Sequence, residues 1–145
     1  MSLRVGIGHQ KYFSERYFRP VDIWAMGAMA VEVATLKPLF PGDNEIDQLW
    51  RICAIIGSPR DRGTETRTFG GEWKDGEGLA RELGFSLPEA TPLVMRDVFE
   101  PPHWPSAFGR LVTWCLKWDP SNRPTSRQAM DHEFFTDATD PLKPS

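Results

Sequence analysis

Two glycine-containing stretches are the first candidates for chemistry, because glycine-rich loops bind phosphate groups through their backbone N–H groups. Residues 6–11 read Gly-Ile-Gly-His-Gln-Lys, but Lys11 stands where the third glycine of such a loop belongs, and no strand precedes it. Residues 71–77 have the glycine spacing of a different phosphate loop, with Glu77 at the position of its lysine. A carboxylate there would repel phosphate. Neither stretch therefore predicts a nucleotide site.

The side chains that bind metals or act as nucleophiles are scattered along the chain. His9, His103 and His132 have no partner at a ligand spacing, so we expect no metal site. No Gly-x-Ser-x-Gly turn presents a nucleophile, and no pair of acids has a hydrolase context. Cys53 and Cys115 each lie in an apolar segment, which predicts two core cysteines in a reducing compartment.

Length and charge restrict the partners that this protein can bind. The 145 residues allow one domain or part of one. With 17 basic and 20 acidic side chains, the chain has no net positive field for nucleic acid or an anionic membrane. The start of the chain has no long apolar run, and no later segment is apolar for long enough to span a bilayer. We expect a soluble intracellular protein of the cytoplasm, the nucleus or both.

The hydrophobic pattern predicts an all-α protein with three main helices. Residues 21–36 are apolar almost all round, which is typical of a central buried helix, and Pro20 and Pro38 mark its two ends. A second helix, over about 45–56, begins after the capping residue Asn44 and stops at Gly57. It is amphipathic. A third helix is expected over 106–117, with Trp114 and Trp118 at its margins.

Shorter elements and irregular segments complete the expected organisation. Thr125 and Gln128 have the spacing of a capping box that opens a short helix ending near Asp131. Residues 60–105 form a long irregular insert with one short helix over 79–83. We expect Trp73, Phe85 and Trp104 to anchor this insert. The remaining segments are an irregular lead-in over 1–19 and a loose tail over 136–145.

Two motifs connect this sequence to a known family. Asp22-x-Trp24-x-x-Gly27 resembles the start of the central helix in the large lobe of a protein kinase, and Asp119-Pro-x-x-Arg123-Pro resembles the final subdomain of that lobe. The resemblance covers residues 20–135, the C-terminal half of the lobe. Segment 43–49 is similar to that of the cyclin-dependent and mitogen-activated kinases. Segments 71–73 and 113–120 are most similar to the male-germ-cell-associated and meiosis-inducing kinase branch.

The resemblance implies a scaffold without catalytic residues. Asp22 would accept hydrogen bonds from the backbone of the catalytic loop, although an acid in a first helical turn also simply balances the helix dipole. Arg123 would pair with the glutamate of an Ala-Pro-Glu motif, in preference to being a solvated surface residue. Trp24, Gly27 and Asp119 complete this structural set.

The motifs that bind ATP and transfer phosphate do not occur in this sequence. A complete kinase has a glycine-rich loop, a strand lysine, a His-Arg-Asp catalytic loop and an Asp-Phe-Gly metal site. Where Ala-Pro-Glu is expected, residues 6–10 read Gly-Ile-Gly-His-Gln. We therefore expect no cofactor for this chain, whereas the intact family uses ATP and magnesium. The abrupt loss of the pattern favours a truncated, alternatively started or misassembled product.

The absent partners have an energetic consequence. Leaving one member of a buried ion pair alone costs about 3–5 kcal/mol, and a whole domain is stable by only about 5–15 kcal/mol. If Asp22 and Arg123 are both buried and unpaired, the fold is marginal. We expect weak cooperativity and exposed helix surfaces that bind an apolar dye.

Two functions and one trivial outcome remain open. The chain is part of a Ser/Thr kinase that acts on protein substrates or regulators and is inactive alone. Alternatively, it is a non-catalytic binding module that uses the insert and the helix over 45–56, with Trp73 and Trp104 as partner contacts. In the other interpretation of Trp73 and Trp104, which we favour, both side chains only pin the insert to the core. The third outcome is a product without a role that is degraded.

Overall fold

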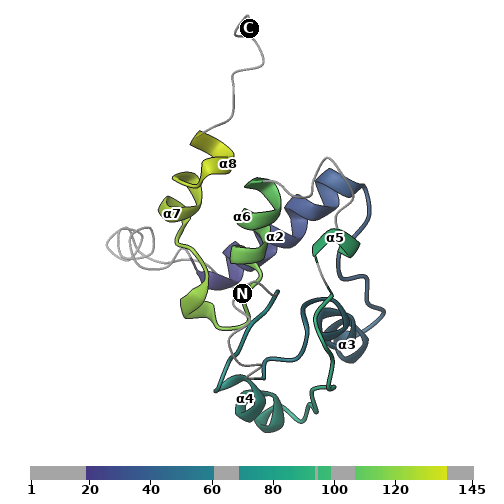
Figure 1. Ribbon diagram of the computed structural model, residues 1–145. Helices are drawn as coiled ribbons and strands as arrows, with labels where there is room; N and C mark the ends of the chain where they lie inside the picture. Colours follow the sequence, from purple (N-terminus) through teal and green to yellow (C-terminus); the bar gives the residue numbers. More distant parts are fainter. Residues whose placement is uncertain (1–18, 61–68, 94, 99–106, 137–145) are drawn as a thin grey trace, which may run out of the picture.

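The computed structural model describes residues 19–60, 69–93, 95–98 and 107–136, and within these ranges the protein is helical without a strand (Figure 1). One isolated parallel bridge joins Gly70 to Lys117. The predicted all-α class is confirmed. In chain order, the elements are α2 (Pro20–Thr35), α3 (Glu45–Ile56), α4 (Gly76–Glu82), α5 (Met95–Val98), α6 (Ala107–Cys115), the 3-10 helix η1 (Pro120–Asn122), α7 (Ser126–Met130) and α8 (Glu133–Thr136).

Helix α2 has the bounds that its prolines predict. Pro20 occupies the first turn, where a missing N–H costs nothing, and Leu36 ends the helix in the left-handed conformation, at φ 59°. The N–H of Leu36 donates to the carbonyl oxygen of Glu32 at 2.8 Å. Non-glycine residues rarely adopt this conformation, and Pro38 follows two positions later.

The caps of α3 and α7 also follow the sequence. The side chain of Asn44 accepts a hydrogen bond of 2.9 Å from the backbone N–H of Asp47, and Gly57 ends α3 at φ 82°. Thr125 and Gln128 form the predicted capping box, with hydrogen bonds of 2.9 and 3.1 Å. Each cap needs only residues three or four positions apart, so the sequence alone predicts it.

The short elements differ more from expectation. The short helix predicted over 79–83 is α4, which begins three residues earlier, at Gly76. The sequence did not predict α5, η1 or α8, because segments of three or four residues are too short to show a helical period.

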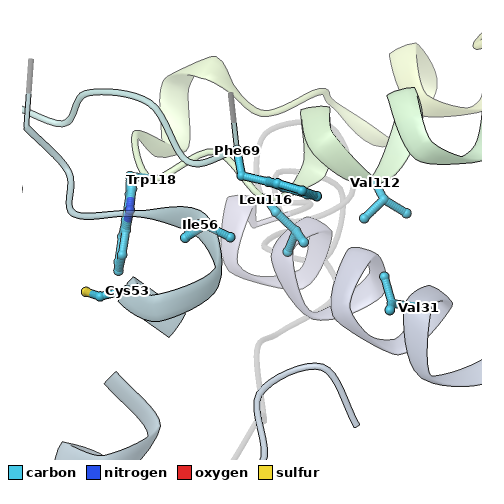
Figure 2. Close-up of a cluster of buried hydrophobic side chains, with 7 residues drawn as sticks. All are labelled: Val31, Cys53, Ile56, Phe69, Val112, Leu116 and Trp118. Carbon is cyan, nitrogen blue, oxygen red and sulfur yellow. The ribbon is translucent and has the colours of Figure 1, made fainter. Parts of the chain in front are cut away.

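The core joins the three main helices. Figure 2 shows its buried side chains, which come from α2, α3, α6 and the segments beside them: Val31, Cys53, Ile56, Phe69, Val112, Leu116 and Trp118. Trp118, expected at the margin of a helix, is only 8% exposed. Its indole N–H donates to the Gly57 carbonyl oxygen at 2.8 Å. Among the described residues of the insert, Phe69 is fully buried, whereas the predicted anchors Trp73 and Phe85 are half-buried.

Helix α2 buries one face and exposes the other. Ile23, Gly27 and Val31 are buried, and α2 packs against α6 on this side. Met29 and Val33 are 63% and 72% exposed. The apolar composition predicted that α2 is buried on all sides. Within the described part of the chain, only one face of α2 is buried.

Candidate functional site

Arg123 connects the segment after α6 to the start of α2. Its guanidinium donates to three backbone carbonyl oxygens: those of Lys117 at 2.7 Å, Trp118 at 3.0 Å and Pro20 at 2.9 Å. The guanidinium carbon also lies 4.9 Å from the ring centroid of Trp24, within cation–π distance. A cation that satisfies three carbonyls and an aromatic face has a structural role.

These contacts correct the expectation that Arg123 lacks a partner. Backbone carbonyls substitute for the glutamate that the resemblance implies. Burial lowers the pKa of the Arg123 guanidinium, and the nearby Asp119 carboxylate acts in the opposite direction. An arginine remains charged despite such a shift. The penalty for a buried unpaired charge therefore does not apply to Arg123.

Trp24 connects Arg123 to the core. Its ring centroid lies 5.8 Å from that of Trp118 and 6.0 Å from that of Phe40. Both distances are within the range of favourable aromatic pairs. The tryptophan of the predicted motif thus has a structural position between the arginine and the core.

Gly27 lets α2 and α6 approach closely. A Cβ atom at this position would lie 2.8 Å from the Cβ of Cys115, closer than real Cβ atoms come, and 3.4 Å from Leu116. Burial raises the pKa of the Cys115 thiol to about 11, as expected of a core cysteine. The glycine is therefore required by packing between two helices.

Asp119 organises the turn that carries Arg123. Its carboxylate accepts hydrogen bonds from the backbone N–H and the hydroxyl of Ser121, at 2.9 and 2.7 Å, and so caps η1. The structure thus places Trp24 and Asp119 beside Arg123, and Gly27 lies one turn along α2 from Trp24, against α6.

Asp22 differs from these residues in being exposed. It is in the first turn of α2 and is exposed, so water solvates its carboxylate, and no burial penalty arises. Met26, Met29 and Val33 follow it at steps of three or four residues, which places them on the same face of the helix. All three are exposed. A row of exposed apolar side chains that begins at an acid marks a surface suited to a covering partner.

A second open surface lies between α3 and α4. Here Trp73 and Leu79 line a groove of about 630 Å³. The ring of Trp73 lies against Gly76, where an added Cβ would come within 2.6 Å of it. Trp73 therefore both pins α4 and lines an open surface. Trp104 lies outside the described residues. The sequence predicted a binding surface made of the insert and the helix over 45–56, with Trp73 in it, and this groove lies between those two segments.

The described residues include no cluster of metal ligands, and the groove between α3 and α4 offers no cation to phosphate. Among them, no group of three or more His, Cys, Asp or Glu side chains could hold a metal ion. The groove between α3 and α4 has no basic side chain in its lining to pair with phosphate. Within the same ranges, no helix has the length and apolar content needed to cross a membrane.

Comparison with known proteins identifies the family. The protein kinase domain model matches residues 11–135. Human serine/threonine-protein kinase MAK is 34% identical over 122 residues, covering 84% of this chain and 18% of MAK. Mouse serine/threonine-protein kinase ICK is 35% identical over 122 residues, covering 84% of this chain and 18% of ICK. The yeast meiosis induction protein kinase IME2/SME1 is 36% identical over 126 residues, covering 82% of this chain and 19% of that kinase.

A solved structure agrees with these relatives. The MAP kinase LmaMPK10 from Leishmania major has a TM-score of 0.60 and 25% identity, and the similarity covers 85% of this chain and 33% of that chain. The chain thus spans about a fifth of the length of the curated relatives it matches. It belongs to the protein kinase family and corresponds to part of a kinase domain like those of the MAK, ICK and IME2 serine/threonine kinases.

Proposed function

We propose that this chain forms the C-terminal part of the large lobe of a cytoplasmic or nuclear Ser/Thr protein kinase. The complete kinase would transfer the γ-phosphoryl group of ATP to hydroxyl groups of protein substrates. The observation that carries the proposal is the exposed face of α2, defined by Asp22, Met26, Met29 and Val33. It is the surface on which the catalytic part of the lobe would pack.

The physical argument for a covering partner is hydrophobic. Fully burying one such aliphatic side chain is worth about 1.5–3 kcal/mol, and three of them lie together on this face. The Asp22 carboxylate can accept hydrogen bonds from backbone N–H groups of the covering segment, and charge-assisted bonds of this kind are strong. This supports the role that the family resemblance implies for Asp22.

The chain alone should not transfer phosphate. Phosphoryl transfer depends on a positioned metal, a lysine and a base, and the motifs that supply them do not occur in this sequence. Incubation with labelled ATP and myelin basic protein should therefore give no labelling above background. Labelling that Asp22→Ala abolishes would contradict this part of the proposal.

The exposed face of α2 can be tested with an apolar dye. We expect the chain to enhance the fluorescence of anilinonaphthalene sulfonate, and the double variant Met29→Ser/Val33→Ser to lose about half of that enhancement, because exposed apolar surface binds the dye. Met130→Ser is the matched control, since Met130 is 70% exposed on α7. Equal losses in the two variants would contradict the assignment to α2.

A further inference from the structure

A small pocket beside α4 brings two arginines close to an exposed serine. It measures about 160 Å³, and the side chains that line it are Arg60, Glu77, Arg81, Phe85, Ser86 and Leu87. This volume is below that of an ordinary ligand pocket, so the space suits a small charged group rather than a nucleotide. Guanidinium groups bind phosphate oxygens well, often through two parallel hydrogen bonds. The pocket therefore has the chemistry to hold a phosphate group.

Ser86 is accessible to a modifying enzyme. It is exposed, and it follows α4 in a segment, 85–93, that has no regular secondary structure. Gly84, just before this segment, adopts φ 81°, and nothing lies within 4 Å of a Cβ atom added there. An exposed loop of this kind can adapt to the active site of another protein with little loss of packing.

The residues after Ser86 give it the charge pattern of a kinase substrate. Glu89 stands three positions later. Kinases select their substrates partly by charge, and a kinase with basic groups beside its active site favours an acid at this distance. The Glu89 side chain is 78% exposed and pairs with Arg60 at the surface. Because such surface pairs are weak, Glu89 is available to a modifying kinase.

The fold distinguishes Ser86 from a second serine with the same pattern. Of all the serines and threonines in the sequence, only Ser58 and Ser86 have an acid three positions later. Ser58 is only 3% exposed. Its hydroxyl donates to the Pro88 carbonyl oxygen and accepts from the backbone N–H of Ala90 at 2.7 Å. Burial and these hydrogen bonds protect Ser58, so Ser86 is the site that the structure leaves open.

The charges of the pocket can hold a phosphate on Ser86. Arg81 is exposed and forms no ion pair with the part of the chain that the structure describes, so its guanidinium is available. Arg60 donates to the carboxylate of Glu77 at 2.6 Å and also to that of Glu89. A phosphate has a charge of about −1.5 to −2 and three strong acceptor oxygens. It therefore competes for Arg60 with the exposed Glu89, while Arg60 still neutralises Glu77.

We propose that Ser86 is phosphorylated by an acid-directed kinase and that Arg81 and Arg60 bind the phosphate. In this reaction, the Ser86 hydroxyl oxygen forms a bond to the γ-phosphorus of an ATP molecule held by that kinase. The bond between this phosphorus and the oxygen that bridges it to the β-phosphorus breaks, ADP leaves, and the hydroxyl proton passes to a base of the same kinase. The proposal does not depend on the role of α2.

The first test is phosphorylation of the full 145-residue chain by a purified acid-directed kinase, casein kinase 2, followed by digestion and mass spectrometry. We expect phosphate on Ser86, at a rate that Glu89→Gln lowers by about tenfold or more. Thr91→Ala is the matched control, because Thr91 is an exposed hydroxyl of the same segment without an acid three positions later. It should change the rate by less than about twofold. An unphosphorylated Ser86 would overturn the proposal.

Ser58 reports whether the fold selects the site. In the folded chain, we expect phosphate on Ser86 at a rate at least about tenfold above that on Ser58, because Ser58 must first be exposed by local unfolding. Equal rates at the two serines would show that the fold does not select Ser86 and would overturn the proposal. Ser86, Glu89 and Thr91 are all exposed, so the variants should melt close to the parent.

The second test asks whether the two arginines bind the phosphate. The second pKa of a phosphoserine is about 6, and phosphorus NMR follows it in the phosphorylated chain. We expect this pKa to be lower by about half a unit or more, because a nearby guanidinium favours the doubly charged phosphate. Arg81→Gln should remove at least about half of the shift. Arg51→Gln is the matched control, since Arg51 pairs with Asp47 outside the pocket. Equal pKa values in the parent and Arg81→Gln chains would overturn the proposal.

Discussion

The α2–α6 contact and the α3–α4 groove are both formed between helices, yet the first is closed and the second is open. In the α2–α6 contact, Gly27 lets the helices meet directly over Cys115. In the groove, Leu79 and Leu83 remain largely exposed. α4 is only seven residues long and is held at one end by Trp73 against Gly76, so it covers little of α3.

Stability and binding reside in different surfaces of the molecule. A closed contact between helices has no space to adapt, so substitutions there should act mainly on folding. An open apolar groove contributes little to folding and is available to a partner. Substitutions in the two kinds of surface should therefore differ in their effect on folding.

The largest difference should come from two leucines. Leu116 is fully buried in the core, whereas Leu79 is 44% exposed in the groove. Leu116→Ala should lower the free energy of unfolding by about 2–5 kcal/mol, and Leu79→Ala by less than about 1 kcal/mol. Urea unfolding followed by circular dichroism measures both. Similar losses would mean that the groove is part of the folding core.

Removing the cation that joins α2 to the end of α6 should have the next largest effect. Arg123→Met leaves three backbone carbonyls without their donor, and we expect a loss of about 2–4 kcal/mol. Arg127→Met is the matched control because Arg127 is exposed on α7, and it should change stability by less than about 0.5 kcal/mol. An unchanged melt for Arg123→Met would show that its carbonyl contacts do not stabilise the fold.

Substitution of glycine by alanine should lower the free energy of unfolding at one position and raise it at another. Gly27→Ala places a Cβ against Cys115 and should cost about 1–3 kcal/mol through overpacking. Gly78, in α4, has nothing within 4 Å of an added Cβ, so Gly78→Ala should stabilise by up to about 1 kcal/mol through helix propensity. Thermal denaturation measures the pair. Stabilisation by Gly27→Ala would contradict the close contact between α2 and α6.

A smaller loss is expected at the capping box of α7. Thr125→Ala removes the acceptor for the N–H of Gln128 and should cost about 1 kcal/mol. Thr125→Ser keeps the hydroxyl and should restore most of the stability. Equal melting temperatures for the alanine and serine variants would show that the cap contributes nothing.

The two core cysteines should make the free energy of unfolding depend on pH only in alkaline solution, and not near pH 7. Burial raises the pKa of Cys53 from 9.0 to about 11 and that of Cys115 likewise. Between these two pKa values, both thiols stay protonated in the folded state but ionise in the unfolded state. Their contribution to the stability of the folded state is therefore complete below about pH 9 and is lost as the pH rises toward about 11. The double variant Cys53→Ala/Cys115→Ala should unfold with a shallower dependence in this window. If the parent and the double variant lose stability equally between about pH 9 and 11, the raised pKa values of the two thiols are contradicted.

Local features of the fold could be predicted because they need only neighbouring residues. Asn44 and Thr125 cap their helices through residues three positions away. The first turn of α2 follows from Pro20, whose fixed backbone angle suits that position. Likewise, the family motif that contains Trp24 and Gly27 lies within six consecutive residues, 22–27. None of these inferences requires knowing which distant segments meet.

Features built from distant residues could not be predicted in the same way. Arg123 meets the Pro20 carbonyl across 103 positions, and Trp118 meets the Gly57 carbonyl across 61. The sequence suggested a glutamate partner for the first residue and a helix margin for the second. Backbone carbonyls carry no side-chain signature, so nothing in the sequence marks them as partners.

The sequence by itself therefore determined the helical class and the ends of α2 and α3, because hydrogen bonds and steric limits between near neighbours set these properties. It also determined the family, because the family motifs are short segments of the chain. Only the tertiary structure decided which face of α2 is covered, where the Arg123 guanidinium binds and that a groove opens beside α4. Burial and solvation depend on how distant segments pack together. They are properties of the folded chain as a whole rather than of any single stretch.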